Sequence, residues 1–160
     1  MEEIYGGKGR VALRKRETRM KDIGGKPHVE RVAVAEGRIK LGKESLESIF
    51  QKTAEKGNVL AAAEIAGILA AKHTSSIIPL CHQVPLESVD VGFEKLNDGL
   101  KCTVRVATHW STGVEMDALT GASAALLTVW DMIKEREKDT EGMYPNTSIT
   151  DLRVVQKRKG

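Results

Sequence analysis

Aromatic side chains and cysteines are scarce in this sequence. Aromatic residues make up 4% of its 160 positions, and the two cysteines are Cys81 and Cys102. Proteins that bind single-stranded nucleic acids use aromatic platforms on which bases stack, so the composition argues against that class. Two cysteines cannot build a disulfide framework, and these two do not form a C-x-x-C pair. We expect the core to be aliphatic and rich in alanine.

The sequence also lacks a long apolar run and a signal peptide. Its longest apolar stretch, Val59–Ala71, contains Glu64 and is too short to span a bilayer, and its first ten residues are polar. We therefore expect a cytoplasmic protein that does not bind a membrane. With 41% hydrophobic and 29% charged residues, 160 residues are enough for one globular domain with a buried core.

Positive charge is concentrated at the two ends of the chain. The net charge is +3, and residues 1–26 contain eight Lys or Arg against four Asp or Glu, while residues 153–160 contain four Lys or Arg and no acid. Residues 27–152 therefore carry an excess of acidic side chains. A basic end is usually a solvated arm, although it can also close over a phosphate. We expect a flexible basic arm over residues 1–20 and a single domain over residues 21–160.

Alternation of apolar and polar residues predicts the strands. Residues 28–41 alternate, and a turn at Glu36-Gly37 is expected to divide them into two short strands. Residues 84–110 predict a hairpin whose arms meet at the turn Asn97-Asp98-Gly99. A last strand over residues 148–157 follows a turn at residues 144–146.

Helical periodicity predicts three helices. The first covers residues 43–57 and is expected to end with Gly57 as its C-cap. The second begins after Asn58 as N-cap and presents a packing face of small and apolar residues: Ala62, Ile65, Ala66 and Leu69. The third covers residues 113–138. This order of elements predicts an α+β fold, an antiparallel sheet with helices packed on one face.

The stretch "SSIIPLCHQVP", residues 75–85, places Cys81 and His82 between two prolines. A single cysteine is more often inert packing than a reactive group. His82 is as good a candidate for ligand contact as for structure, because the prolines fix its loop. His73 and His109 have no partners at ligand spacing, so we do not expect a zinc site.

Charged residues at two other places have both a structural and a functional interpretation. Glu115 and Asp117 begin the last helix, where acids complement the helix dipole, but carboxylates around the flexible Met116 could also accept N–H groups of a guanine-like ring. Asp131 and Lys134 are three residues apart on a helix, which fits a surface ion pair or a proton-transfer pair.

Lys56 and the basic C-terminal tail are also ambiguous. Lys56 lies just before a helix, where a lysine is usually solvated but can add charge to an anion site. The tail lysines, Lys157 and Lys159, have the same two interpretations. The residues alone leave all of these alternatives open.

Two longer blocks together resemble one family. "KGNVLAAAEIAGILAAKHTSSIIPLCH" followed by "TGVEMDALTGASAALLTVWDMIK" is similar to the cyclic pyranopterin monophosphate synthases, the MoaC family of molybdenum cofactor biosynthesis. The resemblance covers roughly Lys21 to Lys159. Its short blocks "IAGI", "AAK", "IPLCH", "TGVEM" and "DMIK" stand in the family's order at compatible separations.

The resemblance implies a ferredoxin-like α+β fold and a hexamer made of three dimers, with the active site at a dimer interface. It implies a lyase that converts 3′,8-cyclo-7,8-dihydro-GTP to cyclic pyranopterin monophosphate and pyrophosphate. The implied partners are a small nucleotide substrate and further copies of the chain, not nucleic acid. No redox cofactor and no protein-bound metal are implied, and a dependence on Mg²⁺ is left open.

The resemblance also implies roles for individual residues. Asp131 is matched to a proposed catalytic acid, Lys134 to its partner and Lys56 to a catalytic pocket lysine. The implied substrate-binding residues are Leu80, Cys81, His82, Glu115, Met116, Asp117 and, in the tail, Lys157 in preference to Lys159.

The chain departs from the family pattern at three places. Asp117 stands where many members have Glu, His73 stands where many have Arg, and the tail "VVQKRKG" replaces a lysine- and glycine-rich ending. Two rival functions are a non-catalytic phosphate-binding module and an RNA-binding protein that uses its basic ends. A fold of this class permits both.

Overall fold

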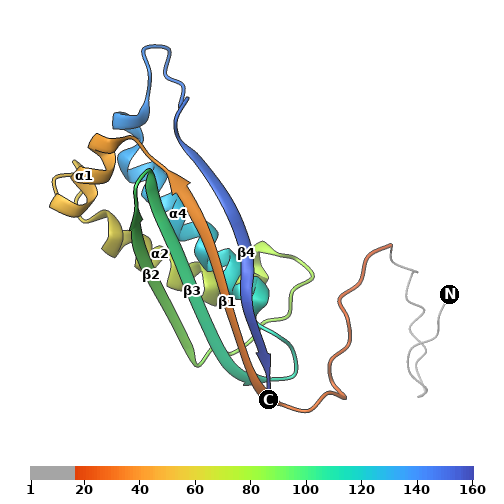
Figure 1. Cartoon of the computed structure of the whole chain (residues 1–160). Helices are drawn as coiled ribbons and strands as arrows, with labels where there is room; N and C mark the ends of the chain where they lie inside the picture. The colour runs from red at the N-terminus through yellow and green to blue at the C-terminus, as the bar shows by residue number, and fades with distance from the viewer. Residues whose placement is uncertain (1–16) are drawn as a thin grey trace.

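The structure is a computed structural model that describes residues 17–160. Its elements run from β1 at the N-terminal side to β4 at the C-terminus (Figure 1). The strands are β1 (Val29–Lys40), β2 (Ser88–Leu96), β3 (Gly99–Trp110) and β4 (Ser148–Lys159). The helices are α1 (Lys43–Gln51), α2 (Val59–Lys72), α3 (Thr74–Ile77) and α4 (Glu115–Glu137). Most of the arm predicted over residues 1–20 lies outside the described residues.

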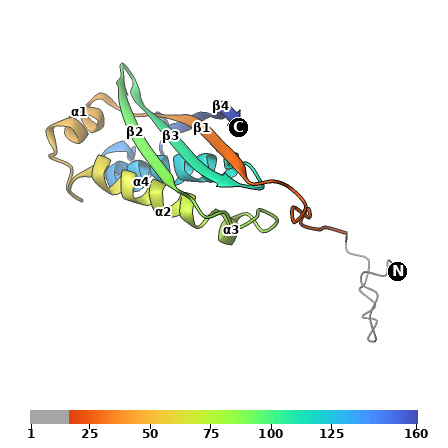
Figure 2. The same ribbon diagram turned by 90° about the horizontal axis from the view of Figure 1, so that it is seen from below.

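The four strands form one antiparallel sheet in the order β2-β3-β1-β4. Helices α2 and α4 lie side by side and cover one face of this sheet (Figures 1 and 2). This order, with a helical crossover before β2 and another before β4, is the ferredoxin-like βαββαβ arrangement. The prediction of an α+β fold with helices on one face is therefore confirmed.

The core lies between the sheet and α4, and it is aliphatic and rich in alanine, as the composition predicts. Alternate residues of β1 and β3 point inward, among them Ala33 and Val104, and meet the buried alanines of α4. Helices α2 and α4 approach closely at two glycines. A Cβ atom added at Gly67 would lie 3.2 Å from the carbonyl oxygen of Gly121, and one at Gly121 would lie 3.0 Å from that of Gly67.

The prediction of a turn at Glu36-Gly37 is wrong, because β1 runs without interruption through both residues. Gly37 has a different function in the fold. A Cβ atom at this position would lie 2.8 Å from Cδ1 of Leu126, so the absence of a side chain lets α4 pack directly on the strand. A glycine required by packing cannot be distinguished in a sequence from a glycine required by a turn.

The first helix ends earlier than predicted. Helix α1 stops at Gln51, and Lys52 takes the left-handed conformation with φ 57°, in place of the predicted cap at Gly57. Gly57, with φ 97°, belongs to the loop before α2. The predicted N-cap of α2 is confirmed, because Oδ1 of Asn58 accepts a hydrogen bond of 3.2 Å from the backbone N–H of Ala61.

The packing face predicted for α2 is wrong. Ile65 and Leu69 are 60% and 50% exposed, while the buried face consists of Val59, Ala63, Gly67 and Ala71. Nearly every residue of α2 is apolar, so periodicity could not select the face that meets α4. None of the helices in the described part of the chain is long and apolar enough to cross a membrane.

Candidate active site

Lys56, Asp131 and Lys134 form one ion cluster, which we call the lysine–aspartate cluster. Nζ of Lys134 donates to Oδ1 of Asp131 at 2.8 Å, and Nζ of Lys56 donates to Oδ2 of the same carboxylate at 2.8 Å and to its backbone carbonyl at 2.9 Å. Lys134 lies one helical turn after Asp131 on α4, while Lys56 comes from the loop between α1 and α2. The structure thus brings together the three residues to which the family resemblance assigns catalytic roles.

The two lysines fix the charge of Asp131. Hydrogen bonds from Lys134 and then from Lys56 lower its pKa to about 2, and the pKa of Lys134 is raised by the same pairing. Asp131 is therefore a carboxylate at neutral pH, and Lys134 carries a proton. Because both pKa values move away from neutral pH, the carboxylate can accept a proton and the lysine can donate one only when a substrate group breaks their ion pair.

A second group of charges lies at the opposite end of α4. Glu115, in the first turn of α4, forms an ion pair with Lys157 of β4. Lys157 lies opposite the buried Ala33 of β1, so it points to the face of the sheet that the helices cover. Burial raises the pKa of Glu115, but the hydrogen bond from Lys157, a backbone hydrogen bond and the charges of Lys157 and Arg31 outweigh it, and the net pKa is lowered.

Asp117 is the buried acid of this end. Its side chain is 3% exposed, and among the described residues its Oδ2 has no hydrogen-bond partner. Burial raises the pKa of Asp117 to about 6, with a smaller contribution from the charge of Glu115. A buried acceptor without a donor is costly for a folded protein, so its presence at this position favours contact with a ligand or another chain.

The loop after α3 lies beside these acids. Burial and the charge of Asp117 raise the pKa of the half-buried Cys81, so its sulfur is a thiol at neutral pH and a poor nucleophile. His82 donates from Nε2 to the carbonyl oxygen of Lys21 at 2.6 Å. The side chains of Leu80 and Met116 are exposed. We call Leu80, Cys81, His82, Glu115, Met116, Asp117 and Lys157 the carboxylate end.

The two groups do not meet within one chain. Glu115 and Asp131 are 16 residues apart on the same helix, which separates them by about 24 Å along its axis at 1.5 Å per residue. The structure therefore divides the predicted site residues into two sets, one at each end of α4.

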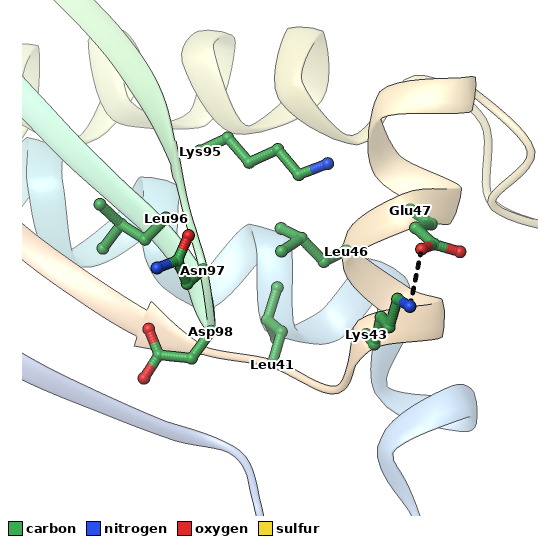
Figure 3. Close-up of a pocket in the computed structure, with 8 residues that line it drawn as sticks. All are labelled: Leu41, Lys43, Leu46, Glu47, Lys95, Leu96, Asn97 and Asp98. Carbon is green, nitrogen blue, oxygen red and sulfur yellow. Dashed lines mark ion pairs between the residues drawn. The ribbon is translucent and has the colours of Figure 1, made fainter.

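Two hollows lie on the surface of the described residues. The smaller, of about 350 Å³, is lined by Leu127, Trp130, Asp131 and Lys134 and therefore adjoins the lysine–aspartate cluster. The larger, of about 510 Å³, lies between α1 and the β2–β3 turn (Figure 3) and contains none of the predicted site residues. Its rim mixes two lysines with Glu47 and Asp98, and Lys43 is paired with Glu47.

Sequence reasoning missed two residues of these groups. Arg31 of β1 donates from Nε to the carbonyl oxygen of Trp110 at 3.4 Å, and its charge acts on Glu115. Tyr144 packs edge-on against Trp130, with ring centroids 5.6 Å apart. Only the pairing of β1 with β3, which places Arg31 opposite Thr108, would have indicated Arg31. Nothing in the local sequence distinguishes Tyr144 from an ordinary turn residue. Within residues 17–160, no three His, Cys, Asp or Glu side chains gather as metal ligands do.

The sequence is similar to proteins of one family. The sequence profile described as "MoaC family" matches residues 20–160. A probable cyclic pyranopterin monophosphate synthase of Sulfolobus acidocaldarius is 55% identical over 140 residues, which are 88% of this chain and 98% of that protein. Its namesake in Thermococcus kodakarensis is 54% identical over 142 residues, 89% of this chain and 91% of that protein. With this identity over nearly the whole of each relative, the chain belongs to the MoaC family.

Proposed function

We propose that this protein is a cyclic pyranopterin monophosphate synthase, a lyase of molybdenum cofactor biosynthesis. Its substrate is then 3′,8-cyclo-7,8-dihydro-GTP, and its products are cyclic pyranopterin monophosphate and pyrophosphate. The observation that carries the proposal is the lysine–aspartate cluster, in which two lysines from distant segments hold one exposed carboxylate. The names of the relatives at 54–55% identity support it.

The proposed reaction needs proton transfers and removal of a polyanion. Opening of the five-membered purine-derived ring and closure of the pterin ring move protons on and off nitrogen, which an ionised Asp131 beside a protonated Lys134 can mediate. A hydroxyl of the substrate attacks the α-phosphorus, the cyclic phosphate forms and pyrophosphate leaves. Lysines next to the departing phosphates stabilise the negative charge that develops.

The carboxylate end provides recognition in this proposal. Glu115 and Asp117 are acceptors for the N–H groups of the guanine-derived ring, and the unpartnered Oδ2 of Asp117 is suited to such a donor. Lys157, which the structure places at Glu115, adds positive charge for the phosphates. No redox cofactor takes part in this proposal.

One substrate molecule must contact both ends of α4, and we propose that two copies of the chain form each site. A span of about 24 Å exceeds the length of a nucleotide. A two-fold axis near Ser123, midway between Glu115 and Asp131, would place the lysine–aspartate cluster of one copy beside the carboxylate end of the other, twice per dimer. The apolar side chains that α2 and α4 leave exposed, Ile65, Leu69 and Leu127, would then lie at or near this contact.

We further propose that three such dimers form a hexamer in the cytoplasm. The hexamer rests on the family resemblance, and the cytoplasmic location rests on the composition of the sequence. The dimer has an additional structural reason, because a monomer leaves the two halves of its site apart.

Turnover is the decisive experiment. Purified protein is incubated with 3′,8-cyclo-7,8-dihydro-GTP while pyrophosphate and the fluorescent oxidation product of the pterin are followed together. Equal amounts of both, lost in Lys134→Ala, are expected. Substrate binding without pyrophosphate would favour the phosphate-binding module. RNA binding that is steep in salt and lost when both basic ends are removed, with no turnover, would favour the RNA-binding protein.

A further inference from the structure

The loop between α4 and β4, residues 138–147, brings Tyr144 back onto the helix that it has just left. The ring of Tyr144 packs against Trp130 in an edge-to-face arrangement, with centroids 5.6 Å apart and planes at 77°. Trp130 directly precedes Asp131, and both line the hollow of about 350 Å³ with Leu127 and Lys134. Tyr144 therefore contacts Trp130, the aromatic residue in the wall of this hollow. Asp131 and Lys134 of the lysine–aspartate cluster line the same wall.

The loop on both sides of Tyr144 is fixed by hydrogen bonds. Before it, Oδ1 of Asp139 accepts from the backbone N–H groups of Glu141 and Met143 at 2.9 and 2.8 Å. After it, Oγ1 of Thr147 donates to Oε2 of the buried Glu137 at 2.5 Å. A loop with these contacts holds the Tyr144 ring in one place.

Glu137 connects this loop to a third element. Its two carboxylate oxygens accept from the backbone N–H of Gly42, at 3.0 and 3.2 Å, where α1 begins. The same side chain thus joins the end of α4, the start of α1 and the loop that carries Tyr144. Lys56 follows α1 in the chain, so both segments that contribute lysines to Asp131 are attached to this junction.

We propose that Tyr144 is a positioning residue for the reaction: its ring braces Trp130 and thereby keeps Asp131 and Lys134 at the wall of the hollow in the arrangement that transfers protons. This role rests on the proposed function, because it concerns the same cluster. The ring, and not the hydroxyl, performs it. An aromatic pair of this kind contributes stabilisation beyond the apolar area it buries.

The proximity of Tyr144 to Lys134 agrees with this role. The pKa of Lys134 is raised chiefly by the hydrogen bond and charge of Asp131, and Tyr144 and Glu135 add smaller effects of the same sign. Tyr144 therefore lies close to Lys134 in space as well as against Trp130.

The test compares Tyr144→Ala with Tyr144→Phe. Met143→Ala is the matched control, because Met143 is the neighbouring loop residue and its side chain is 62% exposed. We expect Tyr144→Ala to lower kcat about three- to tenfold with little change in KM. Tyr144→Phe and Met143→Ala should keep kcat near that of the unmodified protein. The thermal midpoints of all variants are measured with the kinetics.

A second measurement reports on Trp130 itself. In a Trp110→Phe background Trp130 is the single tryptophan of the chain, and adding Tyr144→Ala should make its fluorescence easier to quench with acrylamide. Unchanged kcat in Tyr144→Ala, with Trp130 more accessible, would overturn the positioning role. Equal loss in Tyr144→Phe and Tyr144→Ala would also overturn it, because the hydroxyl would then be the important group.

The two proposals fail in different ways. If the unmodified protein does not release pyrophosphate, the proposed function is wrong. If it does and Tyr144→Ala is indistinguishable from Met143→Ala, the function stands and the role of Tyr144 is rejected.

Discussion

Lys157, three residues from the C-terminus, forms an ion pair with Glu115 in the first turn of α4. The pair joins the edge strand β4 to the carboxylate end. Of the two tail lysines that the sequence left as candidates, Lys157 forms this ion pair, and Lys159 has no ion-pair partner within the described residues.

Lys157→Ala should weaken substrate binding more than Lys159→Ala does. Lys157 contributes a charged hydrogen bond at the site, whose loss costs roughly 1.5–3 kcal/mol, or about ten- to a hundredfold in affinity. Isothermal titration of each variant with substrate, or with pyrophosphate as the product anion, measures the difference. Equal losses in the two variants would mean that the tail acts as diffuse positive charge.

Asp131→Asn should abolish most turnover and leave the fold intact. The carboxylate is exposed, so the substitution leaves the core unchanged, and loss of a proton-transfer group typically lowers the rate 10²- to 10⁴-fold. The control is Glu135→Gln, which breaks the exposed pair of Glu135 with Lys138, also three residues apart and 2.8 Å long. Circular dichroism checks the fold. A Glu135→Gln variant as inactive as Asp131→Asn would refute the specific role of Asp131.

Two inactive variants should restore activity when they share a dimer. Lys134→Ala removes one half of the site and Glu115→Gln the other. In a randomly mixed dimer population half of the molecules are hybrids, and each hybrid has one intact site, so about a quarter of the unmodified activity is expected. Lys134→Ala mixed with Asp131→Asn is the control, because both substitutions lie in the same half. No recovery in the first mixture would contradict a site shared between chains.

Asp117 should make the stability of the unliganded protein depend on pH. Its pKa is raised by burial to about 6 from 3.8, so the folded state binds this proton more tightly than the unfolded state. The contribution of Asp117 therefore becomes less favourable as pH rises through this window, by up to about 3 kcal/mol.

Urea unfolding at several pH values tests this. Asp117→Asn should be more stable than the unmodified protein at pH 8, and the difference should shrink towards pH 4. If the difference between the two proteins is constant across this range, Asp117 is already ionised at low pH and its burial has no such effect.

Local sequence signals predicted the elements that local contacts determine. The Asn97-Asp98-Gly99 turn and the Asn58 cap each depend on neighbours within a few residues, and both are found in the structure. The buried face of α2 depends on which side meets α4, and an almost uniformly apolar helix does not contain that information. The prediction of a turn at Gly37 was wrong for the same reason. Leu126 occupies the space beside Gly37, but it is far away in the sequence.

The candidate site shows the same limit. The spacing of Asp131 and Lys134 indicated their contact, but Lys56 is 75 residues from Asp131, and only the family resemblance pointed to it. The separation of the carboxylate end from the lysine–aspartate cluster follows from their positions on one helix. Tyr144 could not be recognised, since its importance depends on the fold of a loop that returns to its own helix.

The glycine contact between α2 and α4 also bears on the distance from Lys56 to Asp131 in the candidate active site. Lys56 enters the cluster just before α2 begins, and Asp131 is carried by α4, so the spacing of the two helices sets how far the ammonium group must reach. A methyl group at Gly67 or Gly121 would press on the facing helix, because a Cβ atom at either position lies only 3.0–3.2 Å from a backbone oxygen of the other helix. Two residues with no side-chain functional group thus set the distance between α4, which carries Asp131, and α2, which Lys56 precedes.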